Sequence, residues 1–216
     1  MTRWLTDFTY KIEDMATDDM AVYRFVSNYY RDVVKREAVL ANVNSDDNML
    51  CIGGGLCPFS AILFHQITGA NVTVVDNNMA CIPKARQMID RFGMGDKVFA
   101  LCQDGGNMEI DLTQYSVIHL ALQVAPMDYV FSQIERQAAP GTRLLARVPK
   151  KILYGFFGSL PSSSLACCPY VAHKSRNIGS TLLHIKQVVA HEEKTNNIGA
   201  FASPIADACS VCAVST

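Results

Sequence analysis

The chain has 216 residues, a formal net charge of −1 and 18% charged side chains, and half of its residues are hydrophobic. Such a chain is long enough for one sizeable domain with a buried core, and its composition excludes bulk disorder. Nucleic acid is not expected as a partner, because the charge is nearly balanced and no run of Lys or Arg exceeds two residues.

The uncharged stretch 49–75 has to be weighed as a membrane span. It contains four glycines, a proline and His65, whereas a spanning helix requires about 20 continuous apolar residues. No membrane partner is expected, since buried parallel strands also lack charge. The first residues include Arg3, Asp7 and Lys11 and show no apolar signal core, which predicts a cytoplasmic protein. Its eight cysteines are then expected as free thiols, without disulfides or a metal site.

The chain opens with a region of weak signals, residues 1–17, followed by apolar residues at helical spacing between 18 and 41. We expect residues 1–47 to form a helical segment that covers the functional site. A polar turn at 42–48 ends it. The remaining boundaries are expected at 190, after the main domain (48–190), with a C-terminal tail at 191–216.

Strand-like and helix-like segments then alternate along the chain. We expect strands at 49–52, 72–75, 98–102, 117–122, 143–148, 169–173 and 181–189, and helices at 58–66, 82–92 and 127–138, with a further short helix at 152–160. The last two strands have no helix between them. This order predicts an α/β fold with a mostly parallel seven-stranded sheet, an antiparallel last strand and helices on both faces.

The most informative motif lies between the first two strands. The glycines Gly53, Gly54 and Gly55 follow the first strand, Pro58 begins a helix, and Asp76 ends the second strand. Strand, glycine loop, helix, strand and acid is the order in which a Rossmann-like half presents a nucleoside-binding crevice.

Two ligands compete for this crevice. A dinucleotide site requires a third spaced glycine and helix amides for the pyrophosphate, but the chain has Pro58 in that place, which lacks an N–H. S-adenosylmethionine has no phosphate, and its ribose hydroxyls can bond an acid such as Asp76. The layout is therefore that of the Rossmann-like class I S-adenosylmethionine-dependent methyltransferase fold, with S-adenosylmethionine as co-substrate. The residues expected to bind it are Tyr29, Gly53, Gly54, Gly55, Cys57, Pro58, Asp76, Asn77, Gln103, Asp104, Gly105, Leu120, Ala121 and Gln123.

Several segments carry a resemblance to one family. They are E-A-V-L at 37–40, C-I-G-G-G-L-C-P-F-S-A-I-L at 51–63, V-T-V-V-D at 72–76, L-A-L-Q-V at 120–124, and Arg147 followed by I-L-Y at 152–154. With its G-G-G-x-x-P loop, the chain resembles the nicotianamine-synthase-like branch of the class I fold. That family also lacks the acid before the first glycine and the third spaced glycine of ordinary methyltransferases.

The resemblance implies transfer of a 3-amino-3-carboxypropyl group in place of methyl, leaving methylthioadenosine. Asn28-Tyr29-Tyr30 is similar to the family segment whose tyrosine lines the donor pocket. In the family, a preceding helical domain supplies an acid to the active site. Only 48 residues precede Met49 here, so Glu13 or Glu37 would have to take that role.

Tyr30, Glu37 and Asp128 are the candidate catalytic residues, because an amine acceptor needs a base near the mouth of the crevice. Each also has a structural alternative: Tyr30 can pack in the core, Glu37 can be solvated, and Asp128 can cap a helix. His119 is expected to be a core histidine with its hydrogen bonds satisfied.

These observations predict a transferase that moves methyl or 3-amino-3-carboxypropyl to a small-molecule nucleophile, an amine in the first instance. Two alternatives stay open: an S-adenosylmethionine-binding protein without catalysis, and a nicotinamide-dependent oxidoreductase. A homodimer contact is expected, if there is one, at Phe156-Phe157 and the tail.

Overall fold

The computed structural model describes residues 3–150 and 168–187. Its helices are α1 (Arg3–Asp18), α2 (Met20–Leu40), α3 (Phe59–Thr68), α4 (Cys81–Arg91) and α5 (Met127–Gln137), with a short 3-10 helix η1 (Leu112–Gln114). Its strands are β1 (Asn48–Ile52), β2 (Asn71–Asp76), β3 (Val98–Cys102), β4 (Val117–Leu120), β5 (Arg143–Pro149), β6 (Tyr170–Ala172) and β7 (Ile178–Ile185).

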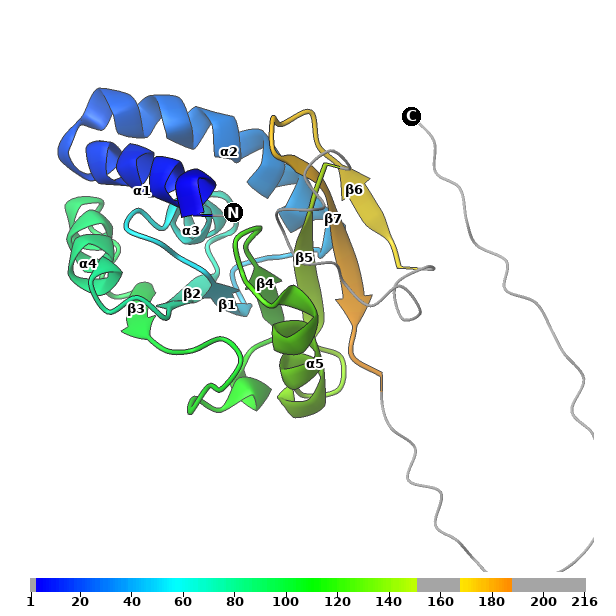
Figure 1. The fold of residues 1–216 in the computed structure, drawn as a ribbon. Helices are drawn as coiled ribbons and strands as arrows, with labels where there is room; N and C mark the ends of the chain where they lie inside the picture. The colour runs from blue at the N-terminus through cyan, green and yellow to red at the C-terminus, as the bar shows by residue number, and fades with distance from the viewer. Residues whose placement is uncertain (1–2, 151–167, 188–216) are drawn as a thin grey trace, which may run out of the picture.

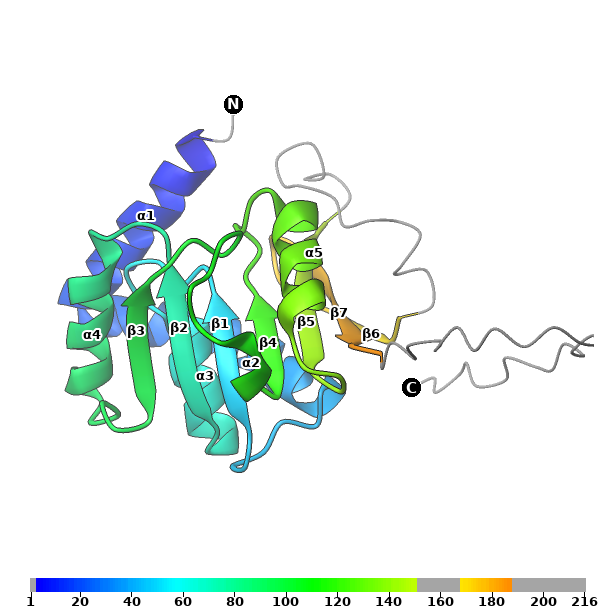
Figure 2. The same ribbon diagram turned by 90° about the horizontal axis from the view of Figure 1, so that it is seen from below.

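The seven strands form one sheet in the order β3-β2-β1-β4-β5-β7-β6 (Figures 1 and 2). Neighbours from β3 to β5 pair in parallel, and β7 is antiparallel to both β5 and β6. The expected fold class is confirmed. Since the carboxyl ends of β1, β2, β3 and β4 meet at one edge of the sheet, the loops that follow them share that edge.

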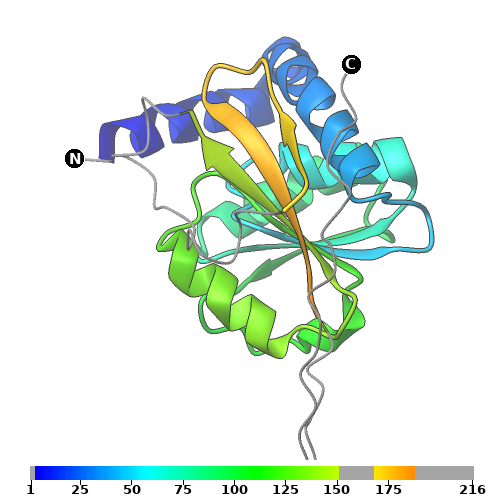
Figure 3. The same ribbon diagram turned by 90° about the vertical axis from the view of Figure 1, so that its right-hand side faces the viewer.

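Helices cover both faces of the sheet, as Figure 3 shows, with α2 and α3 on one side and α5 on the other. In β1, Met49 and Cys51 pack toward α2, α3 and α4, whereas Leu50 and Ile52 pack toward α5 and η1. A strand buried on both faces explains the uncharged run that the sequence shows here.

The helical region expected from 18 to 41 is confirmed as α2, and the weak-signal region before it forms a further helix, α1. Asp19 separates the two helices and caps α2, with its side chain accepting from Ala21 N at 2.7 Å. Helix α1 gave little signal because, among its described side chains from Lys11 onward, only Ala16 and Thr17 are fully buried. Two strands differ slightly from their expected ranges: β4 ends two residues before the expected 122, and β7 begins three residues before the expected 181.

Other expectations fall partly or wholly outside the described residues. These are the helix at 152–160, the I-L-Y segment at 152–154, the Phe156-Phe157 contact and the tail at 191–216 with its two cysteines. Among the described residues, Cys51, Cys57, Cys81 and Cys102 form no disulfide. No helix in the described part of the chain is long and apolar enough to cross a membrane.

A buried ion pair joins α2 to the sheet. Arg147 on β5 donates from Nε and Nη2 to the two carboxylate oxygens of Glu37 on α2, each at 2.8 Å. Thr181 on β7, which pairs with Arg147 across the sheet, donates to Glu37 Oε1 at 2.7 Å. Glu37 is 0% exposed and Arg147 3%, so each charge depends on the other for compensation.

We predict that Glu37→Ala lowers the free energy of unfolding by about 3–5 kcal/mol, because it leaves the Arg147 charge buried and unpaired. Urea unfolding followed by circular dichroism measures this. Asp32→Ala is the matched control: it removes a helix ion pair with Arg36 at 3.0 Å that is solvent-exposed, and should change stability by no more than about 0.5 kcal/mol. A loss at position 37 as small as the control would contradict the prediction.

Candidate active site

The loop after β1 is held against the end of β2. The amides of Gly53 and Gly54 both donate to the Val75 carbonyl, at 2.9 and 3.2 Å. Gly53 has φ +85° and Gly55 φ +62°, a backbone region in which side chains with a Cβ are strained. A Cβ on Gly54 would lie 2.4 Å from Val74 Cγ2. Gly54 is therefore required by the close approach of this loop to β2, and Gly53 and Gly55 by their backbone conformation.

Asp76 ends β2 and fastens the same loop. Its Oδ2 accepts from the Gly55 amide at 2.8 Å and its Oδ1 from the Asn78 amide at 2.9 Å. A carboxylate has about four lone-pair sites, so two remain for a ligand. Asp76 is thus an oriented, half-buried acceptor at the carboxyl edge of the sheet.

Glu13 on α1 contacts the glycine loop that follows β1. Its Oε2 accepts from the Leu56 amide at 3.0 Å, and a Cβ on Gly55 would lie 2.2 Å from that same oxygen. Burial raises the pKa of Glu13 to about 7, with a further increase from the negative charge of Asp76, while the amides of Leu56 and Cys57 oppose the change. Near neutral pH this carboxyl can both accept and release a proton.

Two adjoining cavities open at this edge, which we name by the strands beside them. The β2 cavity is lined by the segments 75–78 and 103–105, together with Gly55, Cys81 and the turn at 124–125. The β4 cavity is lined by Tyr29 and Tyr30, by residues 57–61 at the start of α3, and by His119, Ala121, Leu122 and Arg147. Glu13, Ile52, Gly53 and Gln123 line both, so the cavities meet at the glycine loop.

Tyr29 and Tyr30 form one wall of the β4 cavity. Tyr29 accepts from the Arg176 amide at 2.9 Å, which ties α2 to the turn between β6 and β7. The Tyr30 ring stacks on Phe59 with centroids 5.7 Å apart, and the Arg147 guanidinium lies 5.6 Å from its centroid. Burial raises the pKa of Tyr30 to about 12, so its hydroxyl is a neutral hydrogen-bonding group at pH 7.

Most residues expected at the site are brought together by the fold. Those that line one or both cavities are Tyr29, Tyr30, Gly53, Gly54, Gly55, Cys57, Pro58, Asp76, Asn77, Gln103, Asp104, Gly105, Ala121 and Gln123.

Three expected residues line neither cavity. Leu120 is 0% exposed and packs in the core on the α5 side. Asp128 is exposed in the first turn of α5, where an acid stabilises a helix. Glu37 is fully buried, and although burial opposes its ionisation, Arg147 holds its pKa well below the ordinary range. A locked carboxylate cannot act as a base at the mouth, so Glu37 positions Arg147 instead.

Local sequence pattern indicates the place of Glu13 only weakly and does not indicate that Arg147 and His119 belong to the site. Glu13 lies in a weakly patterned helix, and no local spacing links it to a loop 43 residues further on. Arg147 follows three buried residues of β5 and is itself buried, and a cation in such a strand is the available signal for a paired or functional group. His119 is buried as expected, but within residues 3–150 and 168–187 neither of its ring nitrogens has a hydrogen-bond partner.

The architecture is that of the Rossmann-like class I methyltransferases. No protein-family model matches the chain, and no curated protein matches it in sequence. Among solved structures, the nicotianamine synthase MtNAS in complex with S-adenosylmethionine superposes with a TM-score of 0.70 and 20% identity, covering 86% of this chain and 76% of that one.

Two methyltransferases show the same fold. An RNA methyltransferase from Salinibacter ruber, in complex with S-adenosyl-L-homocysteine, has a TM-score of 0.57 at 18% identity over 78% of this chain and 97% of that one. The geranyl diphosphate C-methyltransferase of Streptomyces coelicolor A3(2) gives 0.52 at 14% identity over 65% and 58%. The class I fold implied by the resemblance to the nicotianamine-synthase-like branch is thus confirmed.

We predict that Gly54→Ala destabilises the protein by about 1–3 kcal/mol, because the added methyl overlaps Val74. Combining it with Val74→Ala removes the overlapping group, so the double variant should lose less than the sum of the two single changes. Thermal and urea unfolding of the four proteins test this. Simple additivity would show that the loop does not press on β2 as described.

Proposed function

We propose that the chain is an S-adenosylmethionine-dependent transferase that moves a methyl or a 3-amino-3-carboxypropyl group to the amine of a small molecule. One observation carries the proposal: Asp76, fixed by two loop amides, lines a cavity that continues past the glycine loop into a second cavity. An elongated ligand with a ribose diol in one half and a reactive centre near the middle matches that arrangement.

In this proposal the donor's adenosine occupies the β2 cavity. The ribose hydroxyls donate to Asp76, and the adenine lies along Gln103, Asp104 and Gly105 at the end of β3. The sulfonium then sits near Gly53, where the two cavities meet, and the methionine portion extends into the β4 cavity. Close approach of the donor to the backbone is what the glycine loop permits.

Glu13 is the residue best placed to act as the base. It lines both cavities, and its pKa of about 7 keeps a substantial fraction ionised at neutral pH. The amine lone pair attacks a carbon on the sulfonium, the carbon–sulfur bond breaks, and its electrons stay on sulfur as a neutral thioether. The proton lost by the amine passes to the Glu13 carboxylate. The protein contributes chiefly alignment of the nucleophile with the carbon–sulfur bond.

The loop resemblance and the extent of the MtNAS superposition support 3-amino-3-carboxypropyl transfer over methyl transfer. Binding without catalysis remains the second candidate, and a nicotinamide-dependent oxidoreductase is disfavoured because Pro58 lines the β4 cavity at the start of α3 without an amide hydrogen. The small-molecule acceptor is an amine in this proposal, and no nucleic-acid or membrane partner is invoked.

We predict that calorimetry detects S-adenosylmethionine binding and that Asp76→Ala weakens it at least about tenfold, the cost of losing hydrogen bonds to a charged group. Asp111→Ala is the control, since Asp111 also accepts a backbone amide, from Thr113, but is not among the residues that line the cavities. Equal affinity in wild type and Asp76→Ala would overturn the site.

Mass spectrometry of reactions with a panel of primary amines then identifies the group transferred. Methylthioadenosine as product shows 3-amino-3-carboxypropyl transfer, and S-adenosylhomocysteine shows methyl transfer. Tight binding without either product would replace the transferase by a binding protein.

We further predict that kcat/KM for the donor rises with pH through about 7, the pKa of Glu13 in the ligand-free protein, because only the ionised carboxyl accepts a proton. Glu13→Gln should lower the maximal rate by about 10²–10⁴-fold and abolish that rise, with donor affinity changed far less. Asp14→Asn on the same helix is the control, since Asp14 is not among the cavity-lining residues. An unchanged pH profile in Glu13→Gln would exclude it as the base.

A further inference from the structure

The floor of the β4 cavity holds two buried polar side chains from neighbouring strands. Cys51 on β1 pairs with His119 on β4, which in turn pairs with Leu145, two residues before Arg147 on β5. Because successive side chains of a strand point to opposite faces of the sheet, this register places Cys51, His119 and Arg147 on the same face. All three line the β4 cavity, and His119 and Arg147 are 1% and 3% exposed.

His119 has hydrogen-bonding capacity that the described residues do not use. Neither ring nitrogen has a partner, and Nε2 lies 3.6 Å from Glu37 Oε2, beyond a good hydrogen bond. The ring is fixed by an edge contact with Phe64, with centroids 5.4 Å apart. Burial and the Arg147 charge lower the pKa of His119, so the ring is neutral and has one N–H to donate.

Glu37 orients Arg147 through two of the three guanidinium nitrogens. Glu37 accepts from Nε and Nη2, and among the described residues no hydrogen bond uses Nη1. The guanidinium plane is held further by Tyr30, whose ring centroid is 5.6 Å from its central carbon. An arginine fixed along one edge by a carboxylate presents its remaining N–H groups in a defined direction.

The start of α3 adds backbone donors to the same cavity. Pro58 precedes the helix and supplies no side-chain cap. The Phe59 amide donates to the Cys57 carbonyl, whereas the amides of Ser60 and Ala61 keep their partial positive charge. Ser60 and Ala61 line the cavity beside His119. By itself a helix start is weak evidence, but here it shares a cavity with a buried, unpartnered histidine.

We propose that the floor of the β4 cavity, formed by His119, Arg147 and the start of α3, binds a carboxylate of an amino-acid substrate. Arg147 and Glu37 cancel in charge and His119 is neutral, so the floor is rich in donors without a large positive charge. A singly charged carboxylate fits that balance better than a phosphate, which carries nearly twice the charge.

The inference rests on the proposed function, because it assigns the part of the substrate that lies beyond the sulfonium. Two sources have the same chemistry: the carboxylate of the donor's own methionine portion, and that of an amino-acid acceptor. Either would supply the acceptor atoms that His119 and Arg147 Nη1 require.

The test compares ligand pairs that differ only at the carboxylate. Calorimetry measures S-adenosylmethionine against its decarboxylated analogue, with methylthioadenosine as a reference that lacks the carboxylate. A second arm measures L-alanine against L-alaninamide with methylthioadenosine saturating. We expect wild type to favour the carboxylate member of one pair by about 10- to 100-fold. Preference in the first arm identifies the donor's carboxylate, and preference in the second identifies the acceptor's.

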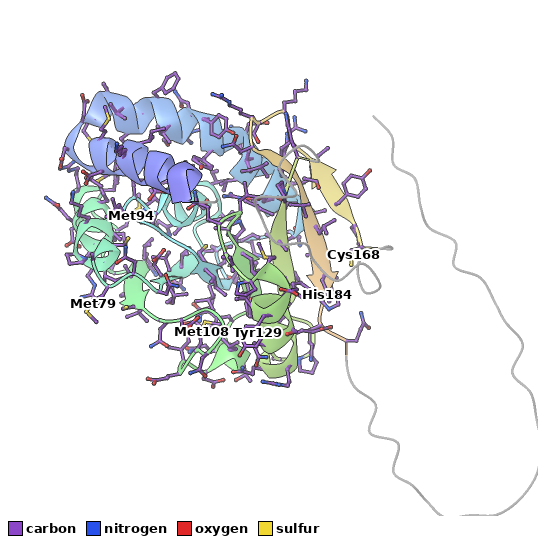
Figure 4. The ribbon with its side chains drawn as sticks, viewed as in Figure 1. Met79, Met94, Met108, Tyr129, Cys168 and His184 are labelled. Atoms are coloured by element: carbon purple, nitrogen blue, oxygen red, sulfur yellow. The ribbon has the colours of Figure 1, made fainter. Side chains whose placement is uncertain are left out.

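Two variants test the floor itself. His119→Phe and Arg147→Lys should each reduce the carboxylate preference at least about fivefold while leaving methylthioadenosine affinity unchanged. Arg147→Lys retains a cation opposite Glu37, and unfolding experiments verify that both variants fold. His184→Phe is the matched control, because His184 on β7 (labelled in Figure 4) also packs edge-on against a phenylalanine, Phe131, and lies near Glu135. It is not among the residues that line either cavity.

The outcomes separate this inference from the proposed function. Methylthioadenosine binding without carboxylate preference in either arm overturns the carboxylate site alone. Folded variants that keep the full wild-type preference overturn it as well. If wild type binds neither S-adenosylmethionine nor methylthioadenosine, the proposed function fails and the inference fails with it.

Discussion

The buried pairing of Glu37 with Arg147 is the constraint on which the site depends. A carboxylate that is 0% exposed is costly unless it is fully hydrogen-bonded, and Glu37 meets this condition through Arg147 and Thr181. The pair fixes α2 over β5 and β7. Because Tyr30 lies two turns before Glu37 on the same helix, this docking also sets the tyrosine wall of the β4 cavity.

The two glutamates of the N-terminal helices show how environment divides roles between chemically identical groups. Glu37 faces a guanidinium and is held ionised, whereas Glu13 is half-buried beside another acid and has its pKa raised to about 7. Groups whose environments push their pKa values apart take different tasks. The locked carboxylate orients other residues, and the titratable one is suited to proton transfer.

The sequence predicted what depends on local pattern and missed what depends on tertiary contact. The glycines and Asp76 were predictable, because loop and acid belong to one strand–helix–strand unit and β2 ends at the acid. The role of Glu37 was not, since its partner lies 110 residues away, and a glutamate at helical spacing gives no sign of burial. The place of Glu13 at the site was only weakly predictable for the same reason. The amides that bond to it belong to the glycine loop, which α1 contacts only in the folded chain.

The junction of the two cavities places two acids on consecutive amides: Asp76 accepts from Gly55, and Glu13 accepts from Leu56. Their mutual repulsion contributes to the raised pKa of Glu13. A cation bound between them would favour the ionised form and lower that pKa. A sulfonium at this junction is such a cation. Donor binding would therefore favour the ionised, basic form of Glu13 before the acceptor amine binds. In this way the positive charge of the donor would favour the form of Glu13 that accepts the proton from the attacking amine.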